Sequence, residues 1–340
     1  MGNRATRVFR EYVDVRGLVT AVVLILGVSI VPEAPSHAAI SPLTSNPTPF
    51  ASLGALQLAL KHAETIQTVP SGLSPTLVQV ASAPFPFEGA SYQHTNCNPY
   101  SNPSEATHPN PCWYGSLVAT APIVVLFGDS FVGNWIPALD IVGQKLGFRI
   151  ASFEFSGCDT PDVTATVGSA FTPAQVAACN LWHSTLPKEV ASLHPKAIIA
   201  ANGAPDWGTP GDSSWISGMK YEFSKMNPKG LSAQILLGTG PHLTSSAPAC
   251  LAASFTSVQK CTYHFTLTSN FAKALARDAS AVKLVHVHLV PTYQWVCVSA
   301  ACPMIINSTL VFVDTDHLST NFSLQMSSLL TAALRPLLPH

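Results

Sequence analysis

The sequence predicts an α/β protein, a three-layer α/β/α sandwich around a mostly parallel sheet. Two observations support this: short apolar runs alternate with longer segments of helical periodicity, and the first run ends directly at a glycine. Strands are expected at 123–127, 148–153, 197–201, 234–238 and 283–290. Helices are expected at 134–146, 173–193, 214–226, 267–281 and 319–337. Helices that connect parallel strands cover both faces of the sheet.

The residues that precede the first strand differ in composition. Residues 39–51 are rich in Ser, Pro and Thr, which is typical of a linker. Residues 52–68 carry apolar side chains at helical spacing and predict a short helix, which we expect to brace the chain close to a membrane tether. Pro, Ser and Asn dominate 69–120. We therefore divide the exported chain into a lead-in at 39–120 and an α/β domain at 121–340.

The overall composition excludes several functional classes. Charged residues make up 10% of the chain, apolar residues 47%, mean hydropathy is +0.28 and the net charge is −1. A chain with so little net charge lacks the basic surface that binds nucleic acid. Only residues 18–31 are uniformly apolar, and a membrane-spanning helix needs about 20 such residues. A polytopic membrane protein is therefore excluded.

The N-terminus has the pattern of an export signal. The apolar run 18–31 is followed by Ser36-His37-Ala38, which places small residues at −3 and −1 of a cut after Ala38. Basic residues precede the run: Arg4, Arg7, Arg10 and Arg16. We expect 1–38 to be a signal peptide or an uncleaved signal anchor, with a buried core helix as the remaining alternative. The first two alternatives place the rest of the chain outside the cytoplasm, secreted or anchored to the cell membrane.

The cysteine count agrees with export. An even number of cysteines in an exported chain indicates disulfides, and there is no C-x-x-C pair of the kind found in zinc ribbons and thioredoxin-like sites. Proximity along the sequence favours four local bridges, and free thiols in a cytosolic protein are the alternative. The expected pairs are Cys97–Cys112, Cys158–Cys179, Cys250–Cys261 and Cys297–Cys302.

The first candidate for chemistry is Gly128-Asp129-Ser130, directly after the first predicted strand. A serine at this strand-to-helix turn lies at the carboxyl edge of a parallel sheet, where open α/β folds bind ligands. Gly128 permits a tight turn, and the N–H groups of the following helix could stabilise an oxyanion. The tripeptide is common by chance, so its position carries more weight than its letters.

The second candidate is the run from Asp314 to His317, close to the C-terminus. A serine nucleophile needs a base to take its proton, and the base needs a carboxylate to orient it. An Asp and a His three residues apart on one turn supply both. Ser130, His317 and Asp314 are therefore the predicted catalytic residues, with Asp316 as the less favoured acid.

These blocks resemble the SGNH (GDSL-type) hydrolase superfamily, whose fold is flavodoxin-like. More narrowly, the chain resembles the SGNH domain that is fused to the membrane domain of acyltransferase-3 O-acyltransferases, over about residues 55–335. The segments that match are Gly128-Asp129-Ser130 with Trp135 and Pro137-Ala138-Leu139, Ser156-Gly157-Cys158, Cys179-Asn180-Leu181-Trp182, Cys250 and Cys261, Cys297 and Cys302-Pro303 with Asn307, and Asp314-x-x-His317-Leu318-Ser319. The resemblance implies the four local disulfides and an oxyanion hole formed by the N–H groups of Ser130 and Gly157, with a turn glycine as the alternative for Gly157.

The sequence departs from that family in three places. The membrane helices are absent, so we expect a stand-alone SGNH protein. The histidine that often follows the GDS block is replaced by Phe131. The third block, G-x-N-D, is not intact, and Asn202 is its nearest candidate. Asn202 is predicted either to donate to the oxyanion or to cap a loop.

Two tryptophans and two histidines are further candidates for substrate contacts or ligands. Trp207 and Trp215 follow the third predicted strand and could stack against a sugar, with ordinary packing as the alternative. His286 and His288 alternate on a predicted strand, and we expect them to be ordinary core or surface residues. No metal and no cofactor are expected.

The resemblance implies an exported serine esterase or O-acyltransferase. Its substrate would be an O-acyl group, foremost O-acetyl, of a cell-envelope glycan, carried through an acyl-serine intermediate. The partners would be the O-acylated glycan or an acyl-acceptor sugar and, for a transferase, a separate membrane acyltransferase. The alternative is a glycan-binding or scaffold module that keeps the SGNH fold without catalysis.

Overall fold

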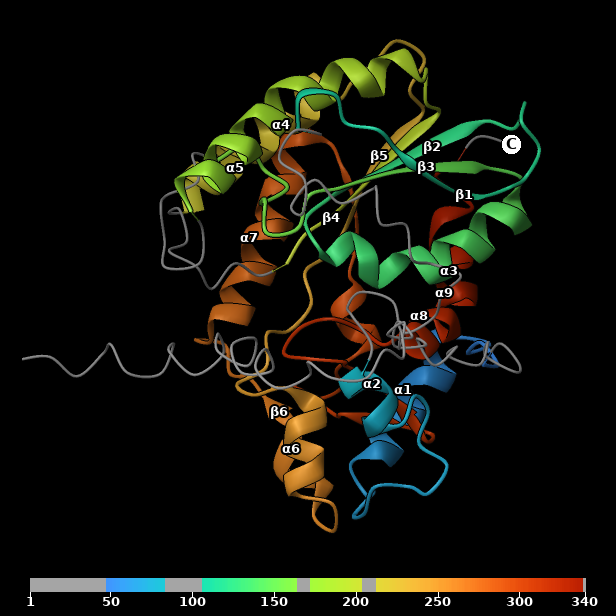
Figure 1. Cartoon of the computed structure of the whole chain (residues 1–340), viewed down its shortest axis with the longest axis vertical. Helices are drawn as coiled ribbons and strands as arrows, with labels where there is room; N and C mark the ends of the chain where they lie inside the picture. The colour runs from blue at the N-terminus through green and yellow to red at the C-terminus, as the bar shows by residue number, and fades with distance from the viewer. Residues whose placement is uncertain (1–46, 83–105, 164–171, 204–211, 339–340) are drawn as a thin grey trace, which may run out of the picture. The chain divides into compact units, whose positions relative to one another are not determined.

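The described part of the chain is built on a six-stranded sheet. A computed structural model describes residues 47–82, 106–163, 172–203 and 212–338 (Figure 1). The strand order is β1-β3-β2-β4-β5-β7; all neighbours are parallel except β1, which pairs antiparallel with β3. The strands are β1 (Cys112–Gly115), β2 (Ile123–Gly128), β3 (Arg149–Glu154), β4 (Ala197–Ala201), β5 (Ala233–Leu237) and β7 (His288–Val290). The predicted α/β class with a mostly parallel sheet is confirmed.

The order of the parallel strands fixes where a ligand can bind. Numbered along the chain, the parallel strands lie in the order 2-1-3-4-5, which is the flavodoxin-like doubly wound arrangement. In such sheets the strand order reverses between the first and third strands, here β2 and β4. Ligands bind at the carboxyl ends of the strands at this switch point. The last paired residues of these two strands are Gly128 and Ala201.

Helices cover both faces of this sheet (Figure 1). Successive residues of a strand point to opposite faces, and β2 shows this directly. Val124 and Leu126 belong to a core formed with α3, α8 and α9, whereas Val125 and Phe127 belong to a second core formed with α4, α5 and α7. The helices are α3 (Phe131–Leu146), α4 (Pro173–Ser192), α5 (Asp212–Lys225), α7 (Asn270–Val285), α8 (Thr320–Gln325) and α9 (Ser327–Leu334).

The lead-in helix is part of the same core. α1 (Leu53–Ala63) begins after the N-cap Ser52, and its stripe of apolar residues includes Leu56 and Leu60, both fully buried. These side chains join the α3, α8 and α9 core, and α1 contacts the short elements β9 (Ile305–Ile306) and η4 (Thr292–Trp295). An apolar stripe at helical spacing must be covered to be stable, so the described lead-in residues and the sheet share one core.

The remaining elements are short helices and two-residue strands outside the central sheet. β9 pairs with β10 and β6 pairs with β8, each antiparallel. These elements are α2 (Leu77–Ser82), α6 (Ala247–Ala253), η3 (Val258–Cys261), β6 (Tyr263–His264), η4 (Thr292–Trp295), β8 (Ala301–Cys302), β9 (Ile305–Ile306) and β10 (Thr309–Leu310).

The structure corrects two predicted elements. The strand expected at 283–290 begins only at His288, because α7 continues to Val285 and ends at the left-handed residue His286, whose φ is 57°. His286 and His288 therefore do not share a strand. The helix expected at 319–337 is divided into α8 and α9 at Met326.

The predicted export segment lies outside the described residues. This applies to the apolar run 18–31 and to the expected cut after Ala38. No helix in the described part of the chain has both the length and the hydrophobicity that crossing a bilayer requires.

Candidate functional site

The nucleophile turn follows β2 at the switch point of the sheet. Gly128 has a φ of 144°, and a Cβ there would lie 1.9 Å from the carbonyl oxygen of Ala201, so only glycine fits. Ser130 is the N-cap residue of α3, but its hydroxyl makes no capping hydrogen bond. The tight turn therefore presents Ser130 at the helix N-terminus with its hydroxyl free for another partner.

Asp129 ties this turn to the neighbouring strand. Its two carboxyl oxygens accept the N–H groups of Phe131 and Gly203, each at 2.8 Å. Burial raises the pKa of Asp129 to about 8, although both backbone donors lower it. Asp129 thus satisfies the start of α3 in place of a Ser130 cap, and it joins the ends of β2 and β4.

Ser130, His317 and Asp314 form one hydrogen-bonded chain. Nε2 of His317 lies 2.8 Å from Oγ of Ser130, and Nδ1 lies 2.7 Å from Oδ2 of Asp314. Ser130 and His317 are 187 positions apart in the sequence. The structure therefore brings together all three residues that the sequence selected, in the order that a serine nucleophile requires.

The turn that carries His317 is held from two sides. Oδ1 of Asp314 accepts the N–H groups of Asp316 and His317, at 2.9 and 2.8 Å. On the other side, Oδ1 of Asn134 on α3 accepts the N–H of Leu318 at 2.8 Å. The Asp314 carboxylate is thus fixed by its own turn before it meets the imidazole, which leaves the ring little freedom to rotate.

The surroundings of Asp314 and His317 favour the ionised carboxylate and the protonated imidazole. Burial of the Asp314 carboxyl raises its pKa, but the hydrogen bond and charge of His317 and the two backbone donors lower it to about 2. Burial of the His317 ring lowers its pKa, but the hydrogen bond to Asp314 and the charges of Asp316 and Asp314 raise it above the usual range. The protonated imidazole that forms during proton transfer is therefore stabilised by Asp314.

Asp316, the less favoured acid, also lies beside the ring. Its Oδ1 is 3.1 Å from Nδ1 of His317, farther than the Asp314 oxygen at 2.7 Å. The shorter contact and the fixed carboxylate favour Asp314 as the orienting acid.

The sequence predicts an oxyanion hole formed by the backbone N–H groups of Ser130 and Gly157. Within the described ranges, no hydrogen bond uses the N–H of Ser130 or of Gly157. Gly157 is exposed and has a φ of 76°, a conformation that other residues seldom adopt. An N–H group without another partner can donate to a developing oxyanion, so the predicted roles of Ser130 and Gly157 are compatible with these observations.

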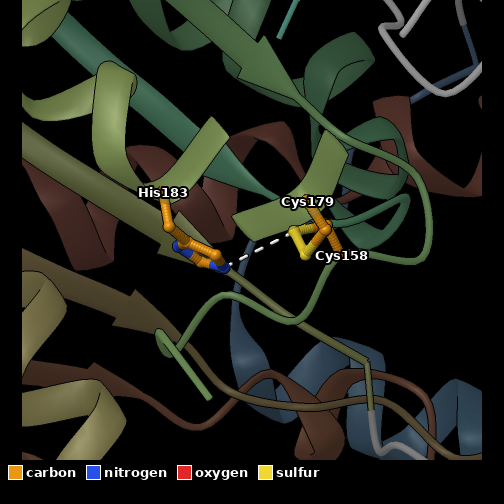
Figure 2. A group of neighbouring side chains, drawn as sticks. All are labelled: Cys158, Cys179 and His183. Carbon is orange, nitrogen blue, oxygen red and sulfur yellow. Dashed lines mark hydrogen bonds between the residues drawn. A yellow bond between two sulfur atoms is a disulfide. The ribbon is translucent and has the colours of Figure 1, made fainter. Parts of the chain in front are cut away.

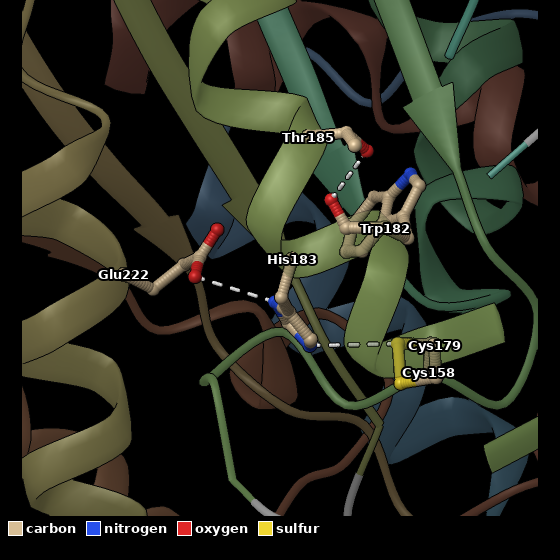
Figure 3. The surroundings of a disulfide bond; sticks show 6 residues. All are labelled: Cys158, Cys179, Trp182, His183, Thr185 and Glu222. Carbon is tan, nitrogen blue, oxygen red and sulfur yellow. Dashed lines mark hydrogen bonds and ion pairs between the residues drawn. A yellow bond between two sulfur atoms is a disulfide. The ribbon is translucent and has the colours of Figure 1, made fainter. Parts of the chain in front are cut away.

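A buried disulfide fixes the loop that carries Gly157. Cys158 is bonded to Cys179 of α4, and Nε2 of His183, one turn further along that helix, lies 3.4 Å from Sγ of Cys158 (Figure 2). Nδ1 of His183 lies 3.3 Å from Oε2 of Glu222 on α5 (Figure 3). Gly157 is thus followed immediately by a residue that is tied covalently and by a hydrogen bond to the helical layer.

Asn202 is engaged inside the protein. It is 1% exposed, and its Nδ2 donates to the carbonyl of Gly203 at 3.1 Å. A hydrogen bond from Asn202 is also among the groups that lower the pKa of Asp278, which burial raises to about 6. These bonds favour the loop-capping alternative, and the oxyanion role of Asn202 remains a prediction that they do not support.

Trp215 does not offer a surface for a sugar. α5 places it on the inward face of the helix, where it is 0% exposed, and the guanidinium of Arg277 lies 3.8 Å from the centroid of its ring. The predicted platform role of Trp215 is therefore wrong, because burial of this large apolar ring completes the core beneath α5. Trp207, the other predicted contact, lies outside the described residues.

Sequence reasoning missed Glu154. It is the last residue of β3, pairs across the sheet with Gly128, and accepts a hydrogen bond from the Ser156 hydroxyl at 3.0 Å. Burial raises the pKa of Glu154 to about 7, although the hydrogen bond from Ser156 and the charge of His317 lower it. The sequence signal that could have identified Glu154 is a carboxylate at the end of an otherwise apolar, buried strand.

Phe131 forms an apolar wall beside the catalytic imidazole. Its ring centroid is 5.7 Å from that of His317. A Cβ at Gly203 or Gly240 would lie 2.6 or 3.1 Å from the Phe131 ring, so the ring fits between two glycines at the ends of β4 and β5. The residue that replaces the family's usual histidine thus fills space that only glycines leave open.

Three of the four predicted disulfides are present. Cys158–Cys179, Cys250–Cys261 and Cys297–Cys302 are bonded, as the sequence predicts. Cys112 is disulfide-bonded as well, but the predicted pairing with Cys97 lies outside the described residues. Bridges of this kind are typical of chains that fold outside the reducing cytoplasm.

Two groups of side chains gather potential metal ligands. One is Cys158, Cys179 and His183, but its cysteines form a disulfide and offer no thiolate. The other is Asp314, Asp316 and His317, whose ligand atoms already bond to one another. Hydrogen bonds and the disulfide thus account for both groups among the described residues.

A Ser–His–Asp chain at the switch point of a doubly wound sheet defines the class: α/β proteins with a serine-hydrolase-type active site. A family model described as the SGNH domain fused to AT3 domains matches residues 96–332. The chain therefore belongs to the SGNH domain family. Membership associates this site with ester hydrolysis or acyl transfer.

Two solved structures resemble the chain at low identity, and the first of them shows the same fold. The periplasmic domain of a lipopolysaccharide acetyltransferase from Salmonella ser. Paratyphi A is 13% identical with a TM-score of 0.53, over 76% of this chain and 98% of that domain. A protein assigned to the G-D-S-L lipolytic family, from Desulfitobacterium hafniense DCB-2, is 14% identical with a TM-score of 0.39, over 62% of this chain and 99% of that protein. No curated protein matches the chain.

Proposed function

We propose that this protein is an exported SGNH-type serine esterase or O-acyltransferase that acts on O-acyl groups, foremost O-acetyl groups, of a cell-envelope glycan. The observation that carries the proposal is the hydrogen-bonded chain from Ser130 through His317 to Asp314. An accidental contact between residues 187 positions apart would not place both ring nitrogens on the two partners that nucleophilic catalysis needs.

The first half of the reaction acylates the serine. His317, with its own proton on Nδ1 facing Asp314, takes the Ser130 proton on Nε2 as the hydroxyl oxygen attacks the ester carbonyl. The negative charge on the carbonyl oxygen is met by the N–H groups of Ser130 and Gly157. His317 then returns the proton to the departing sugar oxygen, which leaves the acyl group on Ser130.

The second half removes the acyl group. His317 takes a proton from the incoming hydroxyl, whose oxygen attacks the acyl-serine carbonyl, and then returns the proton to the Ser130 oxygen. A water molecule as acceptor gives an esterase, and a sugar hydroxyl gives a transferase. For a transferase, we propose that the acyl group comes from a separate membrane acyltransferase.

The substrate and the location rest on different support. The lipopolysaccharide acetyltransferase domain supports the proposal that the substrate is an acetylated envelope glycan. At 13% identity, the likeness to that domain is one of fold. The disulfides support an extracytoplasmic location, and the basic and apolar segment before Ala38 supports a protein that is secreted or held at the membrane by that segment.

The experiment is removal of the nucleophile, Ser130→Ala. Triad members act as a unit, so the variant should lose on the order of 10⁶ in kcat for acetate release from nitrophenyl acetate or an O-acetylated sugar. A fluorophosphonate probe should label Ser130, as mapped by peptide mass spectrometry, and label nothing in the variant. Ser184→Ala, at an exposed serine on α4, is the matched control and should keep full activity and labelling.

Two outcomes would contradict the proposal. Equal activity of the parent and Ser130→Ala would show that Ser130 is not the nucleophile. Absence of both labelling and turnover in the parent, with a range of esters and acyl acceptors, would favour the alternative of a glycan-binding or scaffold module.

A further inference from the structure

A second histidine contacts the catalytic turn from outside it. His242 lies in the loop between β5 and α6, and its Nδ1 is 3.1 Å from Oδ2 of Asp316. The other oxygen of that carboxylate, Oδ1, is 3.1 Å from Nδ1 of His317. One carboxylate, that of Asp316, therefore lies between two imidazoles, of which only His317 belongs to the proposed triad.

The contact is part of a longer junction. The N–H of Leu243 donates to the carbonyl of Thr315 at 2.7 Å, and the N–H of Ala247 donates to the carbonyl of Asp314 at 3.0 Å. The side chains of His242 and Asp316 are only 24% and 20% exposed. His242 is therefore held against the catalytic turn by the backbone on its C-terminal side.

The arrangement places two carboxylates at one imidazole nitrogen. Nδ1 of His317 carries a single hydrogen, and the shorter contact gives it to Asp314. Asp316 cannot share that hydrogen equally, so its charge acts on the ring through space. Without a partner of its own, this charge would compete with Asp314 for the hydrogen and hold the ring in its protonated form, which cannot act as a base.

Resting on the proposed role of His317 as the base, we propose that His242 is a positioning residue of the triad: it offsets the charge of Asp316 and so leaves the His317 Nδ1 hydrogen to Asp314. In this role His242 acts on His317 through Asp316 and takes no part in the bond changes at Ser130. The loop after β5 thereby sets how readily the base accepts a proton.

The other charged groups that face His317 leave this role to His242. Two further carboxyl groups interact with the charge of His317: Asp129 in the turn after β2 and Glu154 at the end of β3. On its own turn the ring meets Asp314 and Asp316. Among the described residues, His242 is the one side chain besides His317 with an ion-pair contact to these carboxylates. The other side-chain donors to them are neutral hydroxyls: Ser156 donates to Glu154 and Thr315 donates to Asp316.

The test follows the protonation of His317 itself and needs no substrate. In histidine-labelled protein, the ring resonances of His317 are assigned by their loss in His317→Ala and are followed from pH 5 to 9, a range in which a histidine titrates. His242→Ala should move the His317 midpoint upward by about half a unit, because the Asp316 charge is no longer shared. Asp316→Asn should move it downward by about 1 unit, because that charge is removed.

The double variant and the kinetics separate positioning from mere structure. His242→Ala combined with Asp316→Asn should titrate like Asp316→Asn alone, since His242 acts only through Asp316. In nitrophenyl acetate hydrolysis, His242→Ala should lower kcat/KM about twofold at the parent His317 midpoint and about threefold well below it, and should recover the parent rate at high pH. His264→Ala, at an exposed histidine of β6, is the control and should leave the titration unchanged.

Two results would overturn the inference: an unchanged His317 midpoint in His242→Ala, or a shift in the same direction as in Asp316→Asn. If the Ser130→Ala test instead showed that the protein has no acyl chemistry, the titration would still decide whether His242 controls His317. The two failures are therefore distinguishable.

Discussion

In two histidine–carboxylate pairs of this protein, Nδ1 of the histidine contacts a carboxylate oxygen, but the surroundings of the pairs differ. In His317 and Asp314 the side chains are 14% and 36% exposed, and the far nitrogen faces the Ser130 hydroxyl at 2.8 Å. In His183 and Glu222 they are 1% and 0% exposed, and the far nitrogen faces a disulfide sulfur at 3.4 Å. Only the first pair faces a hydroxyl and is partly exposed, which the proposed catalysis requires, whereas the second pair is buried inside the fold.

The carboxylates differ in the same sense. Asp314 accepts two backbone N–H groups of its own turn in addition to the imidazole. Oε1 of Glu222 has no hydrogen-bond partner among the described residues. A carboxylate fixed by backbone donors keeps its charge and orientation through a reaction cycle, whereas a buried one depends on the histidine beside it.

Among the carboxylates of the two pairs, the larger effect on turnover is expected at the partly exposed pair, from Asp314→Asn. The amide oxygen can still accept both backbone N–H groups, so the turn should keep its shape. The amide nitrogen would then donate to Nδ1 of His317 and force the ring hydrogen onto Nε2, which could no longer take the Ser130 proton. We expect a fall of about 10⁴ in kcat, as measured with nitrophenyl acetate, and little change in thermal stability.

Asp162→Asn is the matched control, because Asp162 forms a partly exposed ion pair with Lys225. It should keep the parent kcat. An Asp314→Asn variant of nearly full activity would instead assign the orienting role to Asp316.

The buried pair should show the reverse pattern. His183→Ala leaves the Glu222 carboxylate buried without its partner, so the free energy of unfolding should fall by about 3–5 kcal/mol. Urea titration followed by circular dichroism measures the change. His317→Ala, at the exposed pair, should lower stability by less while abolishing turnover; equal losses of stability would remove the distinction between the two pairs.

The disulfide beside the buried pair should support both stability and the Gly157 loop. Replacing Cys158 and Cys179 by alanine should lower the free energy of unfolding by about 3 kcal/mol in the chain-entropy model and also reduce kcat. Replacing Cys297 and Cys302, which close a much shorter loop, should lower it by about 2 kcal/mol without an effect on kcat. An unchanged kcat in the Cys158 and Cys179 variant would separate this disulfide from the site.

The smallest effect is the position of the pH profile. His317 must be neutral to accept the Ser130 proton, and its carboxylate neighbours raise its pKa above the usual 6.5. The acid limb of kcat/KM should therefore rise with a midpoint above pH 6.5, and Asp314, whose pKa is lowered to about 2, should add no limb near neutrality. A midpoint at or below pH 6.5 would show that burial outweighs the carboxylates at His317.

The local sequence determined the elements and the nucleophile. Short apolar runs between helical segments identified β2 to β5 within about a residue, because a strand buried on both faces must be apolar throughout. Gly128 and Ser130 were found because a tight strand-to-helix turn at a sheet edge needs a glycine. The end of α7 was misplaced because its last turn is as apolar as a strand.

Contacts between distant segments could be decided only by the tertiary structure. The sequence placed Ser130, Asp314 and His317 in one site and favoured Asp314 over Asp316, but the burial of Trp215 and the engagement of Asn202 depend on side chains packed from other elements. Likewise, nothing in the residues around His242 indicates a partner 74 positions away. Local patterns report what a segment needs to bury or cap, whereas these contacts arise only when the strand order brings separate loops to one edge of the sheet.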